Sequence, residues 1–271
     1  MKKHFVKSLS LLMILVLGLS LAGCGGSSSN GAANDSPAAA DKTLWDQIQE
    51  KGVITVGNSP DYEPYEYEDG KGNVIGFDID LLGLICDELG IKYELVNMSF
   101  DNIITAVQNG QINIGMSGFS ITPERAEQVD FTTPYLSSAQ AVVVNPDSDI
   151  KTVADLTGKK ITAGMGTTGE TAAKENIEGA EVIGLDNYAA AFMQLKNKGA
   201  DAAVADLPVA QKYAAKDGFV LLSEYLSSED NAIVIQKGNE DLVAAINGAI
   251  EKLQAEGKID ELVAKWMPAA E

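Results

Sequence analysis

The chain has 271 residues and a formal net charge of −19. This acidity argues against nucleic acid and anionic lipid as partners, because both carry negative charge. The only His is His4, which lies in an N-terminal secretion signal that is expected to be cleaved off. Ser-His-Asp and Cys-His hydrolases and zinc sites of the usual Cys and His kind are therefore not expected. We expect no metal or cofactor; carboxylate chemistry, a Ser-Lys pair or binding without catalysis stay open.

Residues 1–23 have the pattern of a bacterial secretion signal. Lysines precede an apolar stretch from Leu9 to Leu21, which is shorter than the roughly 20 residues of a membrane span. Leu21-Ala22-Gly23-Cys24 then places a small residue before a Cys, which is typical of cleavage and lipid attachment at Cys24. An uncleaved anchor is the alternative. We expect an extracytoplasmic protein that is held at the cell membrane by palmitate or a similar lipid on Cys24.

Cleavage would remove three Lys and no acid, so the net charge would change from −19 to −22. Residues 24–43 would follow as a flexible linker, because the stretch 25–41 is mostly Gly, Ser, Ala and Asn and cannot form a core. Beyond the linker, apolar strand-like runs alternate with amphipathic helical runs, and Gly-containing turns separate them. This alternation is typical of an α/β protein.

Periodicity and turn signals predict two series of elements. The first has strands at 53–57 and 112–116, a hairpin turn at Asp69-Gly70, and helices at 80–89 and 103–108. The second begins near Val142 and has strands at 160–163 and 202–205 and helices at 170–176 and 188–196. The stretch 240–266 is expected to be helical. Cys86 sits among apolar residues at helical spacing, so we expect it to pack in the core rather than to react.

Arg125 is the first candidate site residue. It follows Ser117-Gly118-Phe119-Ser120 and lies in the first turn of a helix that Thr122 and Pro123 should begin. A cation there opposes the helix dipole. Either a neighbouring acid (Glu124, Glu127 or Asp130) pairs with Arg125, or Arg125 joins the free backbone N–H groups in holding an anion such as a carboxylate. In the second case Ser117, Gly118 and Ser120 would supply further polar contacts.

Gly164-Met165-Gly166-Thr167-Thr168-Gly169 matches a dinucleotide-binding fingerprint. We do not expect a dinucleotide, because an exported protein meets little NAD and the motif lies deep in the chain. A glycine-rich turn before a helix can still bind an anion through its N–H groups, helped by Thr167 or Thr168. A plain strand-to-helix turn is the alternative.

Asp206 and a group of aromatic residues complete the candidates. Asp206 follows a strand and precedes Pro208, so it is either a helix N-cap or an acceptor for a ligand ammonium at a strand's carboxyl end. Tyr62, Tyr65 and Phe77 either pack in the strands or clamp an apolar part of a ligand. Nearby acids are expected to be solvated: Glu63, Glu66, Glu68 and Asp69.

Several ordered motifs between about Leu44 and Trp266 resemble the polar amino acid solute-binding proteins of ABC importers. They are G-F-D-I-D-L at 76–81, I-T-P-E-R at 121–125, V-D-F-T-T-P-Y at 129–135, D-L-T-G-K at 155–159, G-A-D-A-A-V-A-D at 199–206 and Lys265-Trp266. The resemblance implies two α/β lobes, each a sheet flanked by helices, joined by two crossing strands near 135–139 and 228–233. We expect residues 44–136 plus 233–271 in lobe 1 and 137–232 in lobe 2.

The same resemblance implies roles for individual residues. Arg125 would hold the α-carboxylate of the ligand, helped by Ser120 and Thr168, and Asp206 would accept the α-ammonium. Tyr62 and Phe77 match aromatic walls, and Ser117 and Gly118 match further contacts. Ser59 is also expected to contact the ligand, although many relatives carry Asp at this position. Glutamine-binding members carry Lys where Gly164 stands. Glu63 is a candidate substitute for the missing acid, which would favour a cationic side chain.

These expectations describe a monomeric lipoprotein that captures a free polar amino acid and delivers it to an ABC permease. Two alternatives remain. Exported cyclohexadienyl-type dehydratases resemble the same family, and in them Glu63 or Glu66 would have to serve as general acid. A ligand-sensing module for a membrane receptor is the other.

Overall fold

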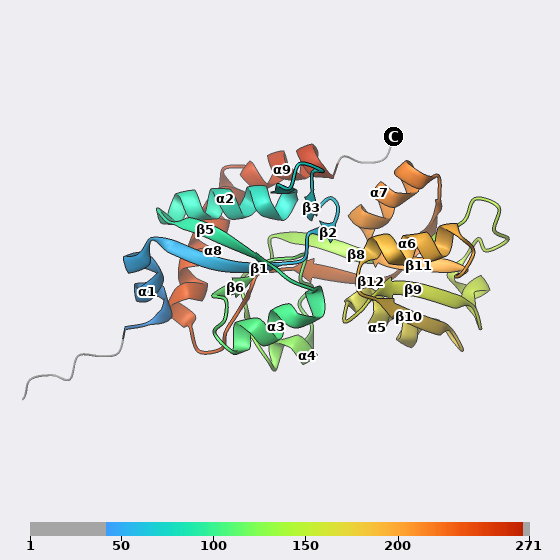
Figure 1. Ribbon diagram of the computed structural model, residues 1–271, viewed down its shortest axis with the longest axis horizontal. Coiled ribbons are helices and arrows are strands. Elements are labelled where there is room, and N and C mark those ends of the chain that lie inside the picture. Colours follow the sequence, from blue (N-terminus) through green and yellow to red (C-terminus); the bar gives the residue numbers. More distant parts are fainter. Residues whose placement is uncertain (1–41, 268–271) are drawn as a thin grey trace, which may run out of the picture. The chain divides into compact units, whose positions relative to one another are not determined.

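The computed structural model describes residues 42–267. The secretion signal, residues 24–41 of the linker and the lipid site at Cys24 therefore lie outside the described residues. The described chain has two mixed sheets with helices on both faces, together with a small hairpin sheet (Figure 1). This is the two-lobe α/β fold that the motifs predict. Its division at 136–137 and 232–233 remains a prediction.

The first sheet has the strand order β5-β1-β6-β13-β7. Its strands are β1 (Val53–Asn58), β5 (Lys92–Asn97), β6 (Ile114–Gly115), β7 (Asp130–Phe131) and β13 (Val234–Ile235). β1 runs parallel to β5 and β6, whereas β13 runs antiparallel to β6 and β7. The helices are α1 (Leu44–Lys51), α2 (Phe77–Leu89), α3 (Phe100–Gln108), α4 (Pro123–Ala126), α8 (Glu240–Ala255) and α9 (Lys258–Trp266).

The second sheet has the order β10-β9-β11-β8-β12. Its strands are β8 (Leu136–Val144), β9 (Lys160–Gly164), β10 (Glu181–Leu185), β11 (Ala202–Asp206) and β12 (Val220–Asn231). The 3₁₀ turn η1 (Val153–Leu156) and the helices α5 (Thr168–Asn176), α6 (Tyr188–Lys196) and α7 (Leu207–Asp217) surround it. β9 is parallel to its neighbours β10 and β11, and β8 is antiparallel to β11 and β12.

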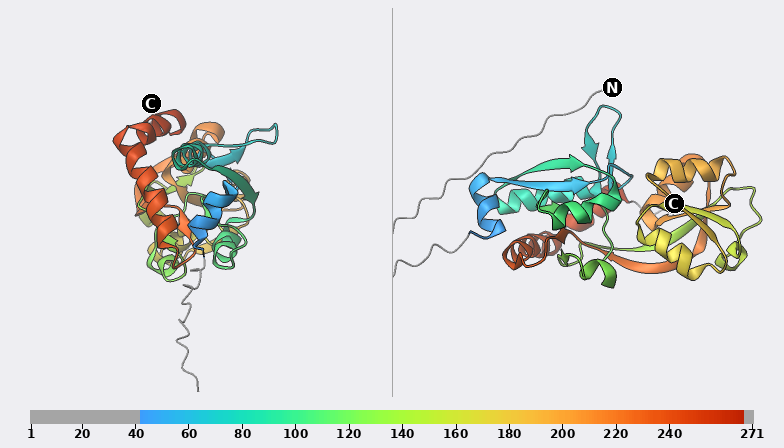
Figure 2. Two further views of the ribbon diagram at one scale, coloured as in Figure 1. Left: turned by 90° about the vertical axis from the view of Figure 1, so that its left-hand side faces the viewer. Right: turned by 60° about the horizontal axis from the view of Figure 1, so that its bottom comes forward.

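The chain passes twice between the sheets. It leaves β7 at Phe131 and enters β8 at Leu136, and it returns from β12 at Asn231 to β13 at Val234. β8 and β12 pair with each other along both passages, where Leu136 is opposite Asn231 (Figure 2). The predicted crossings fall at these places. The hairpin sheet consists of β2 (Asp61–Tyr62), β3 (Glu66–Glu68) and β4 (Val74–Ile75).

Apolar spacing fixes how the helices pack. α2 packs against α8 and α9, and its Leu81, Leu82 and Ile85 are buried. Burial of each such side chain stabilises the fold by about 1.5–3 kcal/mol. Cys86 is buried in the same cluster, which confirms the packing role predicted for it. Burial raises the pKa of its thiol to about 12, which keeps it protonated and unreactive at neutral pH.

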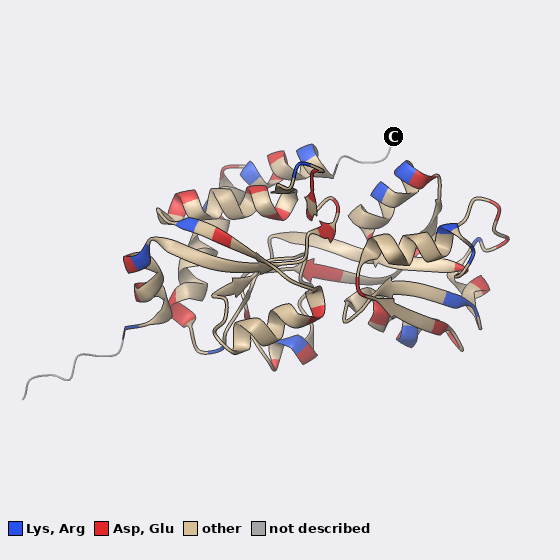
Figure 3. Ribbon diagram, in the orientation of Figure 1, with Lys and Arg blue, Asp and Glu red and all other residues tan. Residues whose placement is uncertain are grey.

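The structure contains the predicted helices and strands, but several of them begin or end at other residues than predicted. α2 begins at Phe77 and not at 80, and the strand predicted for 112–116 is only two residues long, at Ile114–Gly115. The C-terminal helix is two helices, because Gly257 has a φ of 72° and interrupts it. Acidic and basic residues are spread along both sheets and their helices (Figure 3). Within residues 42–267, no helix combines the length and apolar character that a membrane crossing requires.

Candidate functional site

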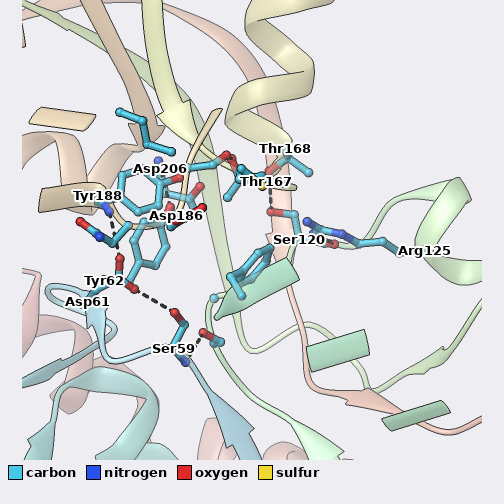
Figure 4. A pocket seen from close by; sticks show the side chains of 17 residues that line it. Ser59, Asp61, Tyr62, Ser120, Arg125, Thr167, Thr168, Asp186, Tyr188 and Asp206 are labelled. Atoms are coloured by element: carbon cyan, nitrogen blue, oxygen red, sulfur yellow. Dashed lines mark hydrogen bonds between the residues drawn. The ribbon is translucent and has the colours of Figure 1, made fainter. Parts of the chain in front are cut away.

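A cavity lies where the carboxyl ends of strands from both sheets meet. The empty space within it, counted together with the solvent at its opening, is about 430 Å³. Nine of the ten predicted ligand-binding residues line it. They are Ser59, Tyr62, Ser117, Gly118, Ser120, Arg125, Thr167, Thr168 and Asp206. Figure 4 shows how their side chains face one another.

Arg125 forms one end of the cavity. Thr122 accepts a hydrogen bond from the Arg125 N–H and Pro123 starts α4, so the local signals for this helix are confirmed. The guanidinium donates to the carbonyl oxygens of Ser120 at 2.9 Å and Gly166 at 3.1 Å. No carboxylate pairs with it among the described side chains. Of its five N–H donors, others thus stay available to an anion.

The surroundings of Arg125 make it a strong anion receptor. Its side chain is buried, and its guanidinium carbon lies 5.4 Å from the ring centres of both Phe100 and Phe119. Burial lowers the pKa of Arg125, but the guanidinium starts from so high a value that it stays charged. A buried cation without a paired carboxylate is favourable for binding a ligand carboxylate.

Asp206 comes from the other sheet, at the end of β11. It occupies the N-cap position of α7, but its side chain makes no cap hydrogen bond. The carboxylate instead accepts a hydrogen bond from Gln140, and its backbone N–H donates to the hydroxyl of Tyr62 at 3.2 Å. Asp206 is only 3% exposed, and within residues 42–267 its Oδ2 has no hydrogen-bond partner. Burial raises the pKa of this carboxyl to about 6.

Hydroxyl groups connect these two charges. Ser120 and Thr168 lie 3.2 Å apart, one from each side of the cavity. Thr168 donates to Glu229 at 2.7 Å and accepts from Gln140 at 3.1 Å. Thr167 is the N-cap of α5, where it accepts from the Glu170 N–H. The glycine-rich turn is therefore a capped helix start at the cavity wall.

The aromatic prediction holds for Tyr62 and not for Phe77. The ring of Tyr62 packs against that of Tyr188, with 4.5 Å between their centres, and both line the cavity. Phe77 is fully buried at the start of α2, where its ring packs edge-on against Tyr65 at 6.4 Å. It lies in the core and does not reach the cavity, because the first turn of α2 directs it between Tyr65 and Tyr135.

Comparison with known proteins identifies this arrangement. The model of the bacterial extracellular solute-binding proteins, family 3, matches residues 54–269. The chain belongs to this family. The L-cystine-binding protein TcyJ of Escherichia coli (strain K12) is 30% identical to this family 3 protein over 234 residues, which are 85% of this chain and 88% of TcyJ.

Solved structures agree with the family assignment. The ancestral amino acid-binding protein AncCDT-1, described as a precursor of cyclohexadienyl dehydratase, is 38% identical with a TM-score of 0.78 and covers 82% of this chain and 99% of its own. An ancestral arginine-binding protein bound to arginine is also 38% identical, with a TM-score of 0.75, and covers 79% of this chain and 98% of its own.

Several cavity residues of this family 3 protein were not predicted. They are Asp61, Phe100, Gly164, Met165, Leu185, Asp186, Asn187 and Tyr188. Asp61 follows Ser59 by two residues and is the acid that reaches the cavity, whereas Glu63 lies outside its lining, 4.0 Å from Lys212. Ser59 lies between β1 and β2, and Asp61 begins β2, so no strand periodicity in the sequence distinguished Asp61 from Glu63.

The close packing of Tyr188 and Thr167 explains why residue 164 is a glycine. A Cβ atom on it would lie 2.8 Å from the ring of Tyr188 and 2.9 Å from Thr167. Side-chain atoms do not approach so closely without a shift. The Lys that glutamine-binding relatives are expected to carry at this position therefore has no room beside Tyr188 here.

Two buried carboxyls support the cavity from behind. Glu66 accepts a hydrogen bond from the Ser117 hydroxyl, and Asp78 accepts from the Gly118 N–H at 2.8 Å and the Tyr135 hydroxyl at 3.1 Å. Glu66 was expected to be solvated, but it is fully buried. Burial raises the pKa of both groups, that of Asp78 to about 7. They hold Ser117 and Gly118 in place and do not face the cavity.

Proposed function

We propose that this family 3 protein captures a free amino acid outside the cytoplasm and delivers it to an ABC permease. The observation that carries this proposal is the pair of opposite charges in one cavity. Among residues 42–267, the guanidinium of Arg125 has no carboxylate partner, and one oxygen of buried Asp206 has no hydrogen-bond partner. A zwitterion satisfies both, with its α-carboxylate on Arg125 and its α-ammonium on Asp206. The relatives that bind cystine and arginine support an amino acid as the ligand.

The ligand would stabilise closure of the two lobes. Arg125 and Ser120 come from elements of the first sheet, and Thr168 and Asp206 come from elements of the second. A ligand that contacts both sets binds the closed form more tightly than the open form, and this difference shifts the population toward closure. β8 and β12 are the strands about which such a motion would turn.

The test is calorimetry of residues 42–271 with each of the twenty amino acids. We expect saturable binding of at least one, with a rise in melting temperature, and loss of this binding in Arg125→Ala. Binding of none of them by a folded protein would overturn the proposal.

We further propose that the protein is not an enzyme. The two candidates for a general acid that the sequence offers, Glu63 and Glu66, do not line the cavity. When the protein is incubated with a cyclohexadienyl acid, the absorbance of that acid should therefore not change. Aromatisation of that substrate would contradict this.

We also propose that a lipid on Cys24 anchors the protein and that it acts as a monomer. Radiolabelled palmitate should enter the wild-type protein in its native host and not Cys24→Ala, and only the wild type should sediment with membranes. Light scattering of the soluble part should give one chain's mass.

A further inference from the structure

We propose that the cavity selects an amino acid whose side chain is positively charged, a guanidinium or an ammonium, and that Asp61 is the residue that recognises this charge. The inference rests on the proposed function, since it concerns the remainder of the same ligand. It names the substrate class, which the family assignment leaves open.

The charges that line the cavity do not balance. Arg125 is the only basic side chain among the 17 lining residues, whereas Asp61, Asp186 and Asp206 are acidic. A bound zwitterion would neutralise Arg125 with its carboxylate and Asp206 with its ammonium. Asp61 and Asp186 would then remain, and neither forms a salt bridge with any Lys or Arg that the structure describes. Asp186 is exposed, so water compensates its charge. Asp61 is half-buried, and a neutral ligand side chain would leave its charge without a partner.

The two kinds of charge lie at different ends of the cavity. In Figure 4 Arg125 and Ser120 lie at one end, and Asp61 lies at the other, beside Tyr62 and Tyr188. Asp206 lies on the side of Tyr62 and Tyr188, where its backbone N–H donates to the Tyr62 hydroxyl, and within residues 42–267 its buried Oδ2 has no partner. An amino acid bound with its carboxylate at Arg125 and its ammonium at Asp206 therefore extends its side chain toward Asp61.

Asp61 is held ready for such a contact. Its Oδ1 accepts from the Ser59 hydroxyl at 2.9 Å, and its Oδ2 accepts from the Tyr188 N–H at 2.9 Å. Each carboxylate oxygen can accept a second hydrogen bond, so both remain competent acceptors while the carboxylate stays in one orientation. Holding a binding group in place beforehand lowers the entropy cost of association.

Aromatic rings surround the path to Asp61. Tyr62 and Tyr188 line the cavity beside Asp61, and their electron-rich rings favour a guanidinium or ammonium that is removed from water. Phe100 lies at the other end, against Arg125. The two tyrosine rings pack against the methylene groups that precede the charge in such a side chain. A long, cationic side chain thus matches both the walls and the end of the cavity.

A purely structural role for Asp61 predicts a different result. Its bond to the Tyr188 N–H joins β2 to the first residue of α6, so Asp61 could serve only to hold the closed form. Loss of that contact would weaken all ligands equally. A role in recognition predicts that only cationic ligands are weakened, and this difference in selectivity separates the two.

The first measurement needs no variant. Arginine and citrulline have nearly the same shape and differ in the charge of the side chain. Calorimetry of the wild-type protein should give a dissociation constant for arginine or lysine at least about tenfold lower than for citrulline and glutamine. Equal or tighter binding of the neutral members would overturn the inference, and the proposed function would stand. Absence of binding by all four and by every other amino acid would overturn the proposed function itself.

The second measurement uses Asp61→Asn with Glu63→Gln as matched control. The Asn oxygen can still accept from the Tyr188 N–H, so the variant removes the charge and keeps the link. We expect Asp61→Asn to weaken the binding of the preferred cationic amino acid at least about tenfold and that of citrulline less than about threefold. Glu63→Gln, which removes a charge outside the cavity, should leave both unchanged. Equal losses for both ligands in Asp61→Asn, or a loss of selectivity in Glu63→Gln, would contradict recognition by Asp61.

Discussion

The guanidinium of Arg125 donates from Nη2 to the carbonyl oxygen of Gly166 at 3.1 Å, and this bond joins α4 to the loop between β9 and α5. Ser120 and Thr168 meet 3.2 Å apart across the same boundary. The groups proposed to hold the ligand carboxylate are therefore also groups that hold the closed arrangement. Binding and closure are coupled through them, because a ligand at this end adds contacts that only the closed form provides.

Replacement of Arg125 should show how much of the binding depends on the planar guanidinium, which can donate two parallel hydrogen bonds to a carboxylate. We expect Arg125→Ala to weaken amino acid binding by about 2–5 kcal/mol, since it removes one partner of a buried charged pair. Arg125→Lys keeps the charge but cannot bridge two oxygens in one plane, so most of the loss should persist. Calorimetry measures both, with circular dichroism as the check on folding. Wild-type affinity in Arg125→Lys would show that charge alone suffices.

The pH dependence of binding should report Asp206. Burial raises its pKa to about 6, with a further contribution from the charge of Glu229. A ligand ammonium binds the ionised carboxylate, so below pH about 6 a proton must leave before the ligand binds. Affinity should be constant at higher pH and fall by up to about tenfold per pH unit below that value.

Asp206→Asn is the control for this profile. It removes this titrating group, so its affinity should be lower at neutral pH and should fall less steeply below pH about 6 than that of the wild type. An unchanged slope in this variant would assign the titration to another group, and the role of Asp206 as ammonium acceptor would be wrong.

Sequence reasoning located the cavity because its signals are local. The Thr122-Pro123 helix start fixes Arg125 after β6, and the end of β11 fixes Asp206. Both lie at the carboxyl ends of strands, where α/β proteins place their ligands. The resemblance to the family then supplied the pairing of these two positions, which no spacing within the chain could provide.

Contacts between distant segments were beyond such reasoning. Tyr188 was assigned correctly to the first position of a helix, but its packing against Tyr62 depends on how the two lobes meet. The predictions that Phe77 contacts the ligand and that Glu66 is solvated were wrong for the same reason. Aromatic and acidic character alone does not show whether a side chain points to the cavity or to the core behind it.

Asp78 should make the fold less stable as the pH rises toward neutrality. Its pKa is about 7 in the folded chain against an ordinary 3.8, mainly because of burial. The folded state thus binds the proton more tightly, so this contribution is complete below pH about 4 and is lost as pH rises through about 7. The slope should reach at most about 1.4 kcal/mol per pH unit. Urea unfolding across this range measures it.

Asp78→Asn isolates that contribution. An Asn oxygen in place of Oδ2 can accept the same bonds from the Gly118 N–H and the Tyr135 hydroxyl. The variant should therefore be less sensitive to pH than the wild type and at least as stable at pH about 7. Asp87→Asn, on the exposed side of the same helix, should keep the wild-type profile. Identical profiles in all three proteins would place the titration elsewhere.

Substitution of two glycines by Ala should distinguish an effect of packing at the cavity from the general effect of glycine on helix stability. Gly164→Ala adds a methyl group 2.8 Å from the Tyr188 ring, so either Tyr188 moves into the cavity or the strand shifts, and both should weaken amino acid binding. Gly83→Ala adds the same group inside α2, where nothing lies within 4 Å, and should stabilise the fold by about 1 kcal/mol through helix propensity. Calorimetric affinity and thermal unfolding distinguish them, since Gly83→Ala should raise the melting temperature at unchanged affinity. If Gly164→Ala binds amino acids with wild-type affinity, Tyr188 can move away from the added methyl group without disturbing the cavity, and the predicted effect of this contact on binding is wrong.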